Sequence, residues 1–301
     1  MAAAVAAADG RLTGRTQVET PSAGAAAQLW ATLTSLLDRV LAAAGVRTGE
    51  LAAVGCGCGG PMEWPAGRVS PLNIPGWRDF PLADSLKERF GTLVRVHNDA
   101  MCMAVGEHWH GAGRGHQNML GIVVSTGVGG GLILEGRLIN GASGNAGHIG
   151  HVVVDPDNGP PCVCGGRGCL EAIARGPGLA AWAQSQGWRP DDRESTARQL
   201  AADAAGGDAV AVAALRRAGR ALGVAIASAA SLCDLEVVTV GGGLSQAGAL
   251  LFGPLRAAFD THARLAFTRK TKVVPAALGQ DAGLVGAAAL VIAGERYWAR
   301  G

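Results

Sequence analysis

The stretch Gly144-Asn-Ala-Gly-His148-Ile-Gly-His151, followed by Cys162-Val-Cys164-Gly-Gly-Arg-Gly-Cys169-Leu-Glu171, decides how the rest of the chain is interpreted. Three of the seven cysteines fall within eight residues here, and His151 lies eleven positions before the first of them. Three thiolates and one imidazole are the ligand set of a tetrahedral zinc site, and glycines between them let the backbone turn tightly round a metal. Because four protein ligands leave no open position, we expect a structural zinc on His151, Cys162, Cys164 and Cys169. The alternative is three buried or disulfide-bonded cysteines, although Cys162 and Cys164 are close in sequence for pairing.

Composition excludes several classes of protein. At 301 residues the chain can bury a large core, and a content of 49% hydrophobic and 17% charged residues predicts a compact soluble protein of two lobes. A net charge of +2 predicts no strong attraction to nucleic acid or to anionic membranes. An odd number of clustered cysteines fits metal binding in a reducing cytoplasm better than secretion, and no apolar run is long enough to span a bilayer.

A predicted strand over Leu93–Val96 leads into His97-Asn98-Asp99. An aspartate at the carboxyl end of a buried strand faces the crevice where open α/β sheets bind ligands. Taken alone, Asp99 is a helix N-cap about as often as it is a catalytic base.

Two glycine-rich segments each follow an apolar strand. Met119–Val124 runs into Ser125–Gly131, and Leu235–Val240 runs into Gly241–Ser245. Backbone N–H groups in such segments approach phosphate oxygens, and Thr126 adds a hydroxyl. Tight packing explains many glycines as well, but the two segments together suggest a nucleotide on one side of the site and a small polar acceptor on the other.

Other segments carry weaker signals. Asp9-Gly10 predicts a hairpin within residues 1–20, and a helix that follows ends at Gly45. In the loop Ser70–Trp77, Asn73 and Trp77 suit a polar ring-shaped ligand, but a turn-capping Asn73 and a packed Trp77 are equally consistent. Cys56 and Cys58 lack partners at ligand spacing, so small core residues are favoured over a second metal site.

These ordered motifs resemble the ROK family of sugar kinases (repressor, open reading frame, kinase) over nearly the whole chain. Val96-His97-Asn98-Asp99-Ala100 looks like the family's catalytic Asn-Asp, Ser125–Gly131 like its second phosphate loop and Gly241–Ser245 like its adenosine loop. The histidine and cysteine stretch looks like its zinc and sugar signature. The resemblance implies an α/β, two-lobed actin-like (ribonuclease-H-like) ATPase and sugar kinase fold.

The implied domains are a small and a large lobe. We expect residues 1–113 to form a small N-terminal α/β lobe, completed by the C-terminal helix 281–301. Residues 114–280 would form a large α/β lobe with the zinc motif and the nucleotide loops. The family begins with a strand and an Asp-x-Gly-Gly-Thr-Lys phosphate loop, and this sequence starts just after the place where that loop is expected.

The implied activity is ATP-dependent phosphorylation of a hexose hydroxyl, usually that on C6, with Mg²⁺ and a structural Zn²⁺, in a cytoplasmic enzyme that we expect to be a homodimer. Asp99 would be the general base. The resemblance also implies which residues would contact each substrate. Those implied for the sugar are Gly60, Asn73, Asn98, Asp99, His148, His151 and Glu171, and those implied for the nucleotide are Thr126, Gly127, Gly129, Gly130, Gly242 and Gly243.

His148 stands where most family members have glutamate, and the form Ala-Gly-His-Ile-Gly-His resembles bacterial N-acetylmannosamine kinases. A neutral imidazole can donate a hydrogen bond to the carbonyl of a 2-acetamido group, whereas a carboxylate can only accept one. N-acetylmannosamine is therefore the favoured substrate, with glucose or another hexose as the alternative. An alternative of a different class is a non-catalytic sugar-binding sensor, because the first phosphate loop is not in this sequence.

Overall fold

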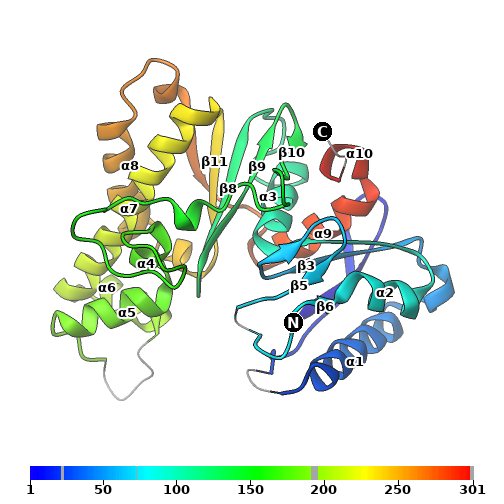
Figure 1. Cartoon of the computed structure of the whole chain (residues 1–301). Helices are drawn as coiled ribbons and strands as arrows, with labels where there is room; N and C mark the ends of the chain where they lie inside the picture. The colour runs from blue at the N-terminus through cyan, green and yellow to red at the C-terminus, as the bar shows by residue number, and fades with distance from the viewer. Residues whose placement is uncertain (22–23, 73, 191–195, 299–301) are drawn as a thin grey trace. The chain divides into compact units, whose positions relative to one another are not determined.

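The computed structural model describes residues 1–21, 24–72, 74–190 and 196–298 of the chain (Figure 1). The chain folds into two compact units, each of which mixes helices and strands as predicted. The first unit comprises Met1–Arg114, Gly131–Ala146 and Gln280–Gly301, and the second comprises Gly115–Gly130 and Gly147–Gly279. Residues 131–146 therefore cluster with the first unit, whereas the sequence alone assigned them to the large lobe.

The first unit opens with the expected hairpin. Strands β1 (Ala2–Ala6) and β2 (Leu12–Gln17) pair antiparallel, and Gly10 takes a positive φ of 82° in the turn. Helix α1 (Ala26–Ala44) follows and ends at Gly45, which has a left-handed φ of 66° and donates its N–H to the last helical carbonyls. A residue with a Cβ is strained in that conformation, which is why glycine stops the helix here.

Strands β3 (Ala53–Cys58) and β7 (Leu93–Asn98) form a parallel pair whose register places Cys58 beside Asn98. A small antiparallel sheet of β4 (Met62–Glu63), β5 (Arg68–Val69) and β6 (Phe80–Pro81) leads into α2 (Leu82–Phe90). One apolar core joins α1, α2, β5 and β7. Trp77 belongs to this core, is 3% exposed and stacks on Phe80 with 4.6 Å between ring centroids, so it is a packed residue.

Helices α3 (Asp99–Trp109) and α9 (Ala282–Ile292) pack backbone against backbone, and the short α10 (Gly294–Tyr297) follows. Two glycines permit this approach. A Cβ on Gly286 would overlap the carbonyl oxygen of Cys102 on α3, and a Cβ on Gly106 would overlap that of Ala282 on α9.

We expect Gly286→Ala to lower the free energy of unfolding by about 3 kcal/mol, because the new methyl group forces the two helices apart. Gly283→Ala is the matched control on the same helix, since its Cβ would meet nothing within 4 Å. The control should raise stability by about 0.5–1 kcal/mol through helix propensity. Urea unfolding of both variants measures the difference, and equal stabilities would contradict the packing argument.

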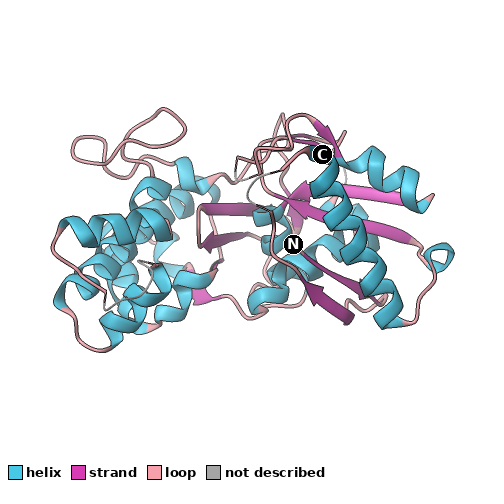
Figure 2. Cartoon of the chain, turned by 90° about the horizontal axis from the view of Figure 1, so that it is seen from below, coloured by secondary structure: helices cyan, strands magenta, loops and turns pink. Residues whose placement is uncertain are grey.

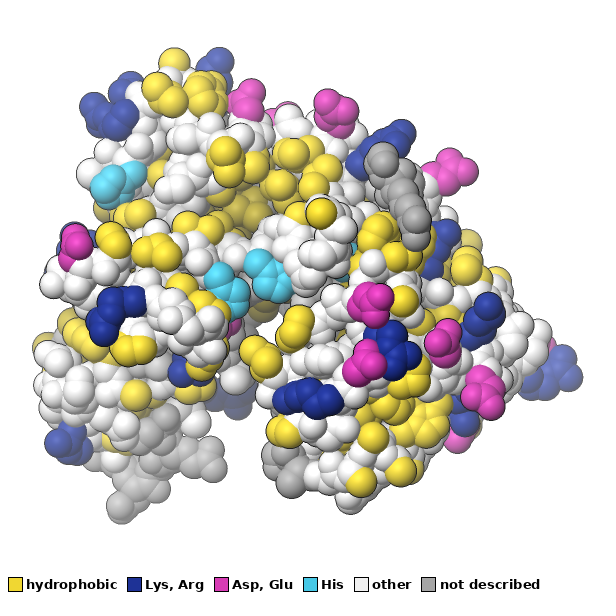
Figure 3. Space-filling view, in the orientation of Figure 1, with side chains coloured by type: hydrophobic (Ala, Val, Ile, Leu, Met, Phe, Trp, Pro, Cys, Tyr) yellow, Lys and Arg dark blue, Asp and Glu magenta, His cyan; other side chains and the backbone are white. Residues whose placement is uncertain are grey.

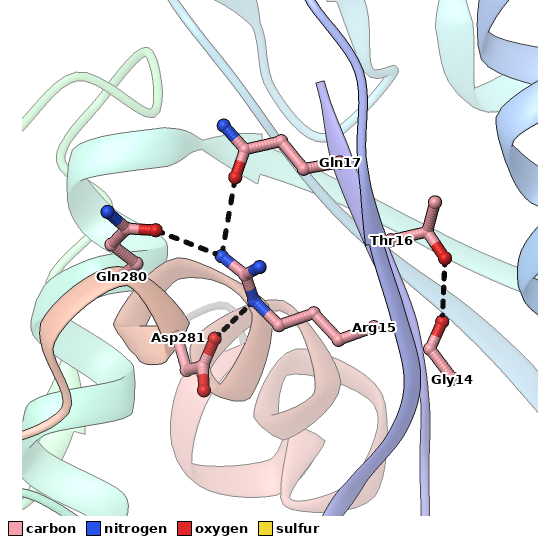
Figure 4. Close-up of polar contacts among 6 residues, drawn as sticks. All are labelled: Gly14, Arg15, Thr16, Gln17, Gln280 and Asp281. Carbon is pink, nitrogen blue, oxygen red and sulfur yellow. Dashed lines mark hydrogen bonds and ion pairs between the residues drawn. The ribbon is translucent and has the colours of Figure 1, made fainter.

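The start of α9 is joined to the N-terminal hairpin by polar contacts (Figure 4). The Arg15 guanidinium donates to the Asp281 carboxylate at 2.6 Å and to the side-chain oxygen of Gln280 at 3.3 Å. Asp281 is the N-cap residue of α9, but its side chain makes no capping hydrogen bond and accepts from Arg15 instead. At partly exposed side chains such a pair stabilises the fold by less than about 1 kcal/mol.

The second unit is built on β8 (Met119–Val124), β11 (Val237–Gly241) and β12 (Lys272–Pro275), with β11 parallel to both neighbours. Strand β9 (Val128–Leu134) lies beside β8 and ends in the first unit, where it pairs with β10 (Arg137–Leu138). The expected loop over Ser125–Gly131 is therefore shorter than predicted, because Gly129, Gly130 and Gly131 lie in a strand.

Helices form most of the remainder of the second unit (Figure 2). They are α4 (Leu170–Ala174), α5 (Gly176–Ser185), α6 (Ala197–Ala205), α7 (Ala209–Cys233) and α8 (Ala249–His262). Helix α7 is the centre of this layer and contacts the other four. In the described part of the chain, no helix combines the length and hydropathy needed to cross a membrane. The face drawn in Figure 3 carries both basic and acidic side chains.

Candidate functional site

The Asn98-Asp99 pair lies where β7 ends and α3 begins. Asn98 is the helix N-cap: its Oδ1 accepts the N–H of Ala100 at 3.0 Å, and the residue is 5% exposed. Asp99 is the first helical residue, is exposed, and accepts the same N–H through its own Oδ1 at 2.8 Å. Asn98, and not Asp99, is therefore the N-cap of α3. Asp99 presents a carboxylate at the carboxyl end of a parallel strand.

His97 precedes this pair and is fully buried. Its Nε2 lies 2.8 Å from Oδ1 of Asn140, and its Nδ1 accepts the backbone N–H of Asn98 at 2.8 Å. Burial lowers the pKa of His97, and the hydrogen bond to Asn140 opposes this shift. The neutral ring therefore contributes stability that is complete above the ordinary pKa of about 6.5 and is lost as the pH falls through the lowered folded-state value.

Strand β3, which pairs with β7, carries Cys56 and Cys58, and Cys102 lies on α3. Burial raises the pKa of the Cys56 thiol to about 12, and it also raises the pKa values of Cys58 and Cys102. Protonated, buried thiols are poor nucleophiles and poor ligands, which agrees with the interpretation of Cys56 and Cys58 as small core residues.

Two residues predicted to bind the sugar, Gly60 and Asn73, follow β3 in the sequence. The carbonyl oxygen of Gly60 accepts the N–H of Leu72 at 3.2 Å. Asn73 lies outside the described residues.

The predicted metal ligands come together in the second unit. One ligand atom from each of His151, Cys162, Cys164 and Cys169 lies within 4.8 Å of all the others. The Sγ of Cys162 is 3.8 Å from Nδ1 of His151, and the Sγ atoms of Cys164 and Cys169 are 3.7 Å apart. All seven cysteines are free thiols, so the disulfide alternative is wrong. We call these four residues the Cys3His cluster.

The Cys3His cluster fits zinc in distance and in chemistry. A tetrahedron with zinc–ligand bonds of about 2.0–2.3 Å has edges of roughly 3.5–3.8 Å between ligand atoms, close to the two separations above. Burial and the two neighbouring thiols raise the pKa of Cys169 to about 12. The raised pKa favours the protonated thiol, whereas a bound divalent cation would favour the thiolate, because a thiol that coordinates a metal is deprotonated. His151 sits on the one-turn helix η2 (Ile149–His151), which offers Nδ1 to the cluster.

Glu171, two residues beyond Cys169, reaches the glycine-rich segment. Its Oε2 accepts the N–H of Val128 at 3.0 Å, and a Cβ on Gly127 would come within 2.9 Å of the same oxygen. The short helix α4 thus joins the Cys3His cluster to the turn between β8 and β9. This contact uses a backbone donor, which no residue pattern in the sequence reveals.

His148 caps η2 in the same unit and is half-buried. Its ring and that of His151 are nearly parallel, with 6.3 Å between centroids and 14° between planes. The residue predicted to select the sugar is therefore held three positions from a ligand of the Cys3His cluster.

The predicted nucleotide residues occupy two strand ends of the second unit. Thr126 is exposed in the turn after β8, and Gly243 is exposed at the start of the helical turn η3 (Gly243–Ala247). Gly242 has a φ of 88°, and a Cβ there would overlap the backbone of Val124 at the end of β8. In the interior of the sheet, a Cβ on Gly130 would lie 2.7 Å from the carbonyl oxygen of Gly121, so this glycine also serves close packing.

Solved structures define the class of protein. A ROK family glucokinase from Streptomyces griseus, solved in complex with glucose and AMPPNP, superposes with a TM-score of 0.83 at 34% identity, covering 96% of this chain and 95% of that one. The predicted actin-like fold of sugar kinases is thereby confirmed.

The family model named ROK family matches residues 1–293, and the chain belongs to this family. A glucokinase from Halalkalibacterium halodurans is 35% identical over 302 aligned residues, 97% of this chain and 92% of that protein. An N-acetylmannosamine kinase from Yersinia pseudotuberculosis is also 35% identical, over 96% of this chain and 93% of that protein. The predicted enzyme class, a sugar kinase, is confirmed at the level of the family.

Proposed function

We propose that the protein transfers the γ-phosphoryl group of ATP to a hexose hydroxyl, that on C6. The observation that carries this proposal is the exposed Asp99 carboxylate, fixed at the first residue of α3 by the N–H of Ala100. The kinase relatives, which match over nearly the whole chain, and the glucose and AMPPNP bound to the Streptomyces griseus enzyme support it.

In the proposed mechanism Asp99 is the general base. Its Oδ1 holds the N–H of Ala100, and the carboxylate takes the proton of the sugar hydroxyl as that oxygen attacks the γ-phosphorus. The bond to the β–γ bridging oxygen breaks and ADP leaves. Phosphoryl transfer depends mainly on positioning and on neutralising charge, and Mg²⁺ carried by ATP supplies part of that charge.

The remaining assignments divide by substrate. Exposed Thr126 and Gly243 offer a hydroxyl and a backbone N–H to the nucleotide, with the glycines Gly127, Gly129, Gly130 and Gly242 allowing close approach. Gly60, Asn73, Asn98, His148, His151 and Glu171 are assigned to the sugar. A structural zinc on the Cys3His cluster would fix the segment that carries His148 and Glu171.

Two further parts of the proposal concern the cellular compartment and the oligomeric state. Thiolate ligands need reducing conditions and the reaction needs ATP, and both favour the cytoplasm. We also propose a homodimer, which light scattering after size-exclusion chromatography tests directly.

For the substrate we propose N-acetylmannosamine, on the ground that His148 can donate a hydrogen bond to an acetamido carbonyl. Glucose is the second candidate, and the observation that favours it is the glucose bound to the Streptomyces griseus enzyme, which is 34% identical to this chain. ADP release measured with a panel of hexoses and N-acetylhexosamines distinguishes the two. Sugar binding without ADP release from any member would favour the sensor and overturn the kinase proposal.

We expect His148→Glu to lower the ratio of kcat/KM for N-acetylmannosamine to that for glucose about tenfold, since one hydrogen-bond donor is exchanged for an acceptor. His262→Glu, which changes an exposed histidine at the end of α8 in the same unit, is the control and should leave the ratio unchanged. An unaltered ratio in the His148 variant would remove the argument for the acetamido sugar.

A further inference from the structure

The two ring nitrogens of His97 are both engaged, and their partners fix the tautomer. The backbone N–H of Asn98 can only donate, so the Nδ1 that it reaches at 2.8 Å carries no proton. A neutral ring then holds its proton on Nε2 and donates it to Oδ1 of Asn140, also at 2.8 Å. The Asn98 N–H and the His97 Nε2–H therefore each meet an acceptor, although Asn140 is 43 positions from His97 in the sequence.

Two indole rings hold the imidazole in this orientation. The ring of Trp64 is stacked on that of His97 at 6.2 Å between centroids with 29° between planes. The ring of Trp298 meets it edge-on at 5.9 Å and 86°. His97 is fully buried and Asn140 is 8% exposed, so water does not readily replace either hydrogen bond.

The geometry points to a positioning role, and we propose that His97 and Asn140 together fix the Asn98-Asp99 corner for catalysis. The route is short: His97 holds the backbone N–H of Asn98, and Asn98 and Asp99 both hold the N–H of Ala100. A shift of Asn98 therefore rotates the carboxylate of Asp99. This inference rests on the proposed role of Asp99 as the base.

A set of variants separates the two hydrogen bonds. His97→Phe keeps an aromatic ring and loses both bonds, and we expect kcat to fall about 30- to 100-fold while KM for the sugar changes less than about threefold, because a displaced base misaligns the reaction more than it weakens binding. His97→Asn places its Oδ1 where Nδ1 stood and restores the acceptor for Asn98, so kcat should recover to within about fivefold of the parent. His97→Gln extends toward Asn140 instead and should not recover.

His108→Phe is the matched control for lost stability. His108 lies on α3 in the same unit, is 3% exposed, and has its Nδ1 2.7 Å from the hydroxyl of Tyr297. This variant removes a comparable buried bond away from the Asn98-Asp99 corner, so we expect lower stability and a kcat within threefold of the parent. Equal loss of kcat in His97→Phe and His108→Phe, or no recovery in His97→Asn, would overturn the proposal.

Two measurements do not depend on activity. Proton–nitrogen spectra of the histidine rings in the whole protein should show His97 neutral with its proton on Nε2, and a proton on Nδ1 would overturn the proposal. Crystal structures of His97→Phe and His108→Phe should show Asn98 and Asp99 displaced in the first variant and unmoved in the second. Should the parent protein phosphorylate no sugar, the role of Asp99 as a base fails, while these two measurements still decide whether His97 positions the corner.

Discussion

Asp99→Asn lowers kcat about 10³-fold with every sugar that the protein phosphorylates, and it leaves the dissociation constant of the sugar within about threefold of the parent value. The amide has the size of the carboxylate, and its Oδ1 can still accept the N–H of Ala100, so the start of α3 keeps its geometry. It cannot take a proton from the attacking hydroxyl, and general-base catalysis is worth about 10²–10⁴ in rate. Steady-state kinetics and calorimetric titration of the sugar give the two numbers.

Asp84→Asn is the matched control for this prediction. Asp84 is an exposed aspartate in the first turn of α2, in the same unit, so the substitution makes the same change in charge in the first turn of a helix. It should leave kcat unchanged. If Asp99→Asn weakens sugar binding by the same factor as turnover, Asp99 is a binding residue and the mechanism needs a different base.

The second large effect is expected from Cys164→Ser. The Cys164 side chain is exposed, so the substitution creates no cavity, and its consequences come from the lost metal–sulfur bond. Because binding of a structural metal contributes directly to folding, we expect bound zinc to fall from one per chain to less than about a tenth. The melting temperature should fall by about 10 °C, because each kcal/mol lost from the free energy of unfolding lowers it by roughly 2–4 °C in a chain of this size.

Cys233→Ser serves as the control, since Cys233 is a half-buried free thiol at the end of α7 and does not belong to the Cys3His cluster. It should keep both its metal content and its melting temperature. Metal analysis by mass spectrometry and differential scanning calorimetry on the same preparations compare the variants. A Cys164 variant that keeps the zinc content and the melting temperature of the parent protein would rule out the structural zinc site.

Local patterns predicted much of the fold. The limits of β8 and the end of α1 at Gly45 agree with the sequence, because continuous apolar character and a C-terminal glycine are local signals. The Cys3His cluster was also predictable, since its ligand types and spacing are specific. Gly129, Gly130 and Gly131 were misassigned to a loop because a glycine has the same appearance in a turn and at a close backbone contact.

Contacts between distant residues were not predictable. The hydrogen bond from His97 to Asn140 and the one from Val128 to Glu171 each join residues 43 positions apart, and neither partner stands in a pattern that requires the other. Trp77 shows the same limit, because a tryptophan in a proline-rich loop is equally consistent with ligand binding and with the core packing that the structure reveals.

The position of the new phosphate on the sugar tests the central claim most directly. The protein, Mg²⁺ and ATP are incubated with the sugar that gives the fastest ADP release, and the product is analysed by phosphorus–proton correlation spectroscopy. A catalytic base at Asp99 acting on a hexose predicts one phosphate ester, coupled to the two protons on C6. ATP consumption that yields only inorganic phosphate, with no sugar phosphate formed, would contradict it.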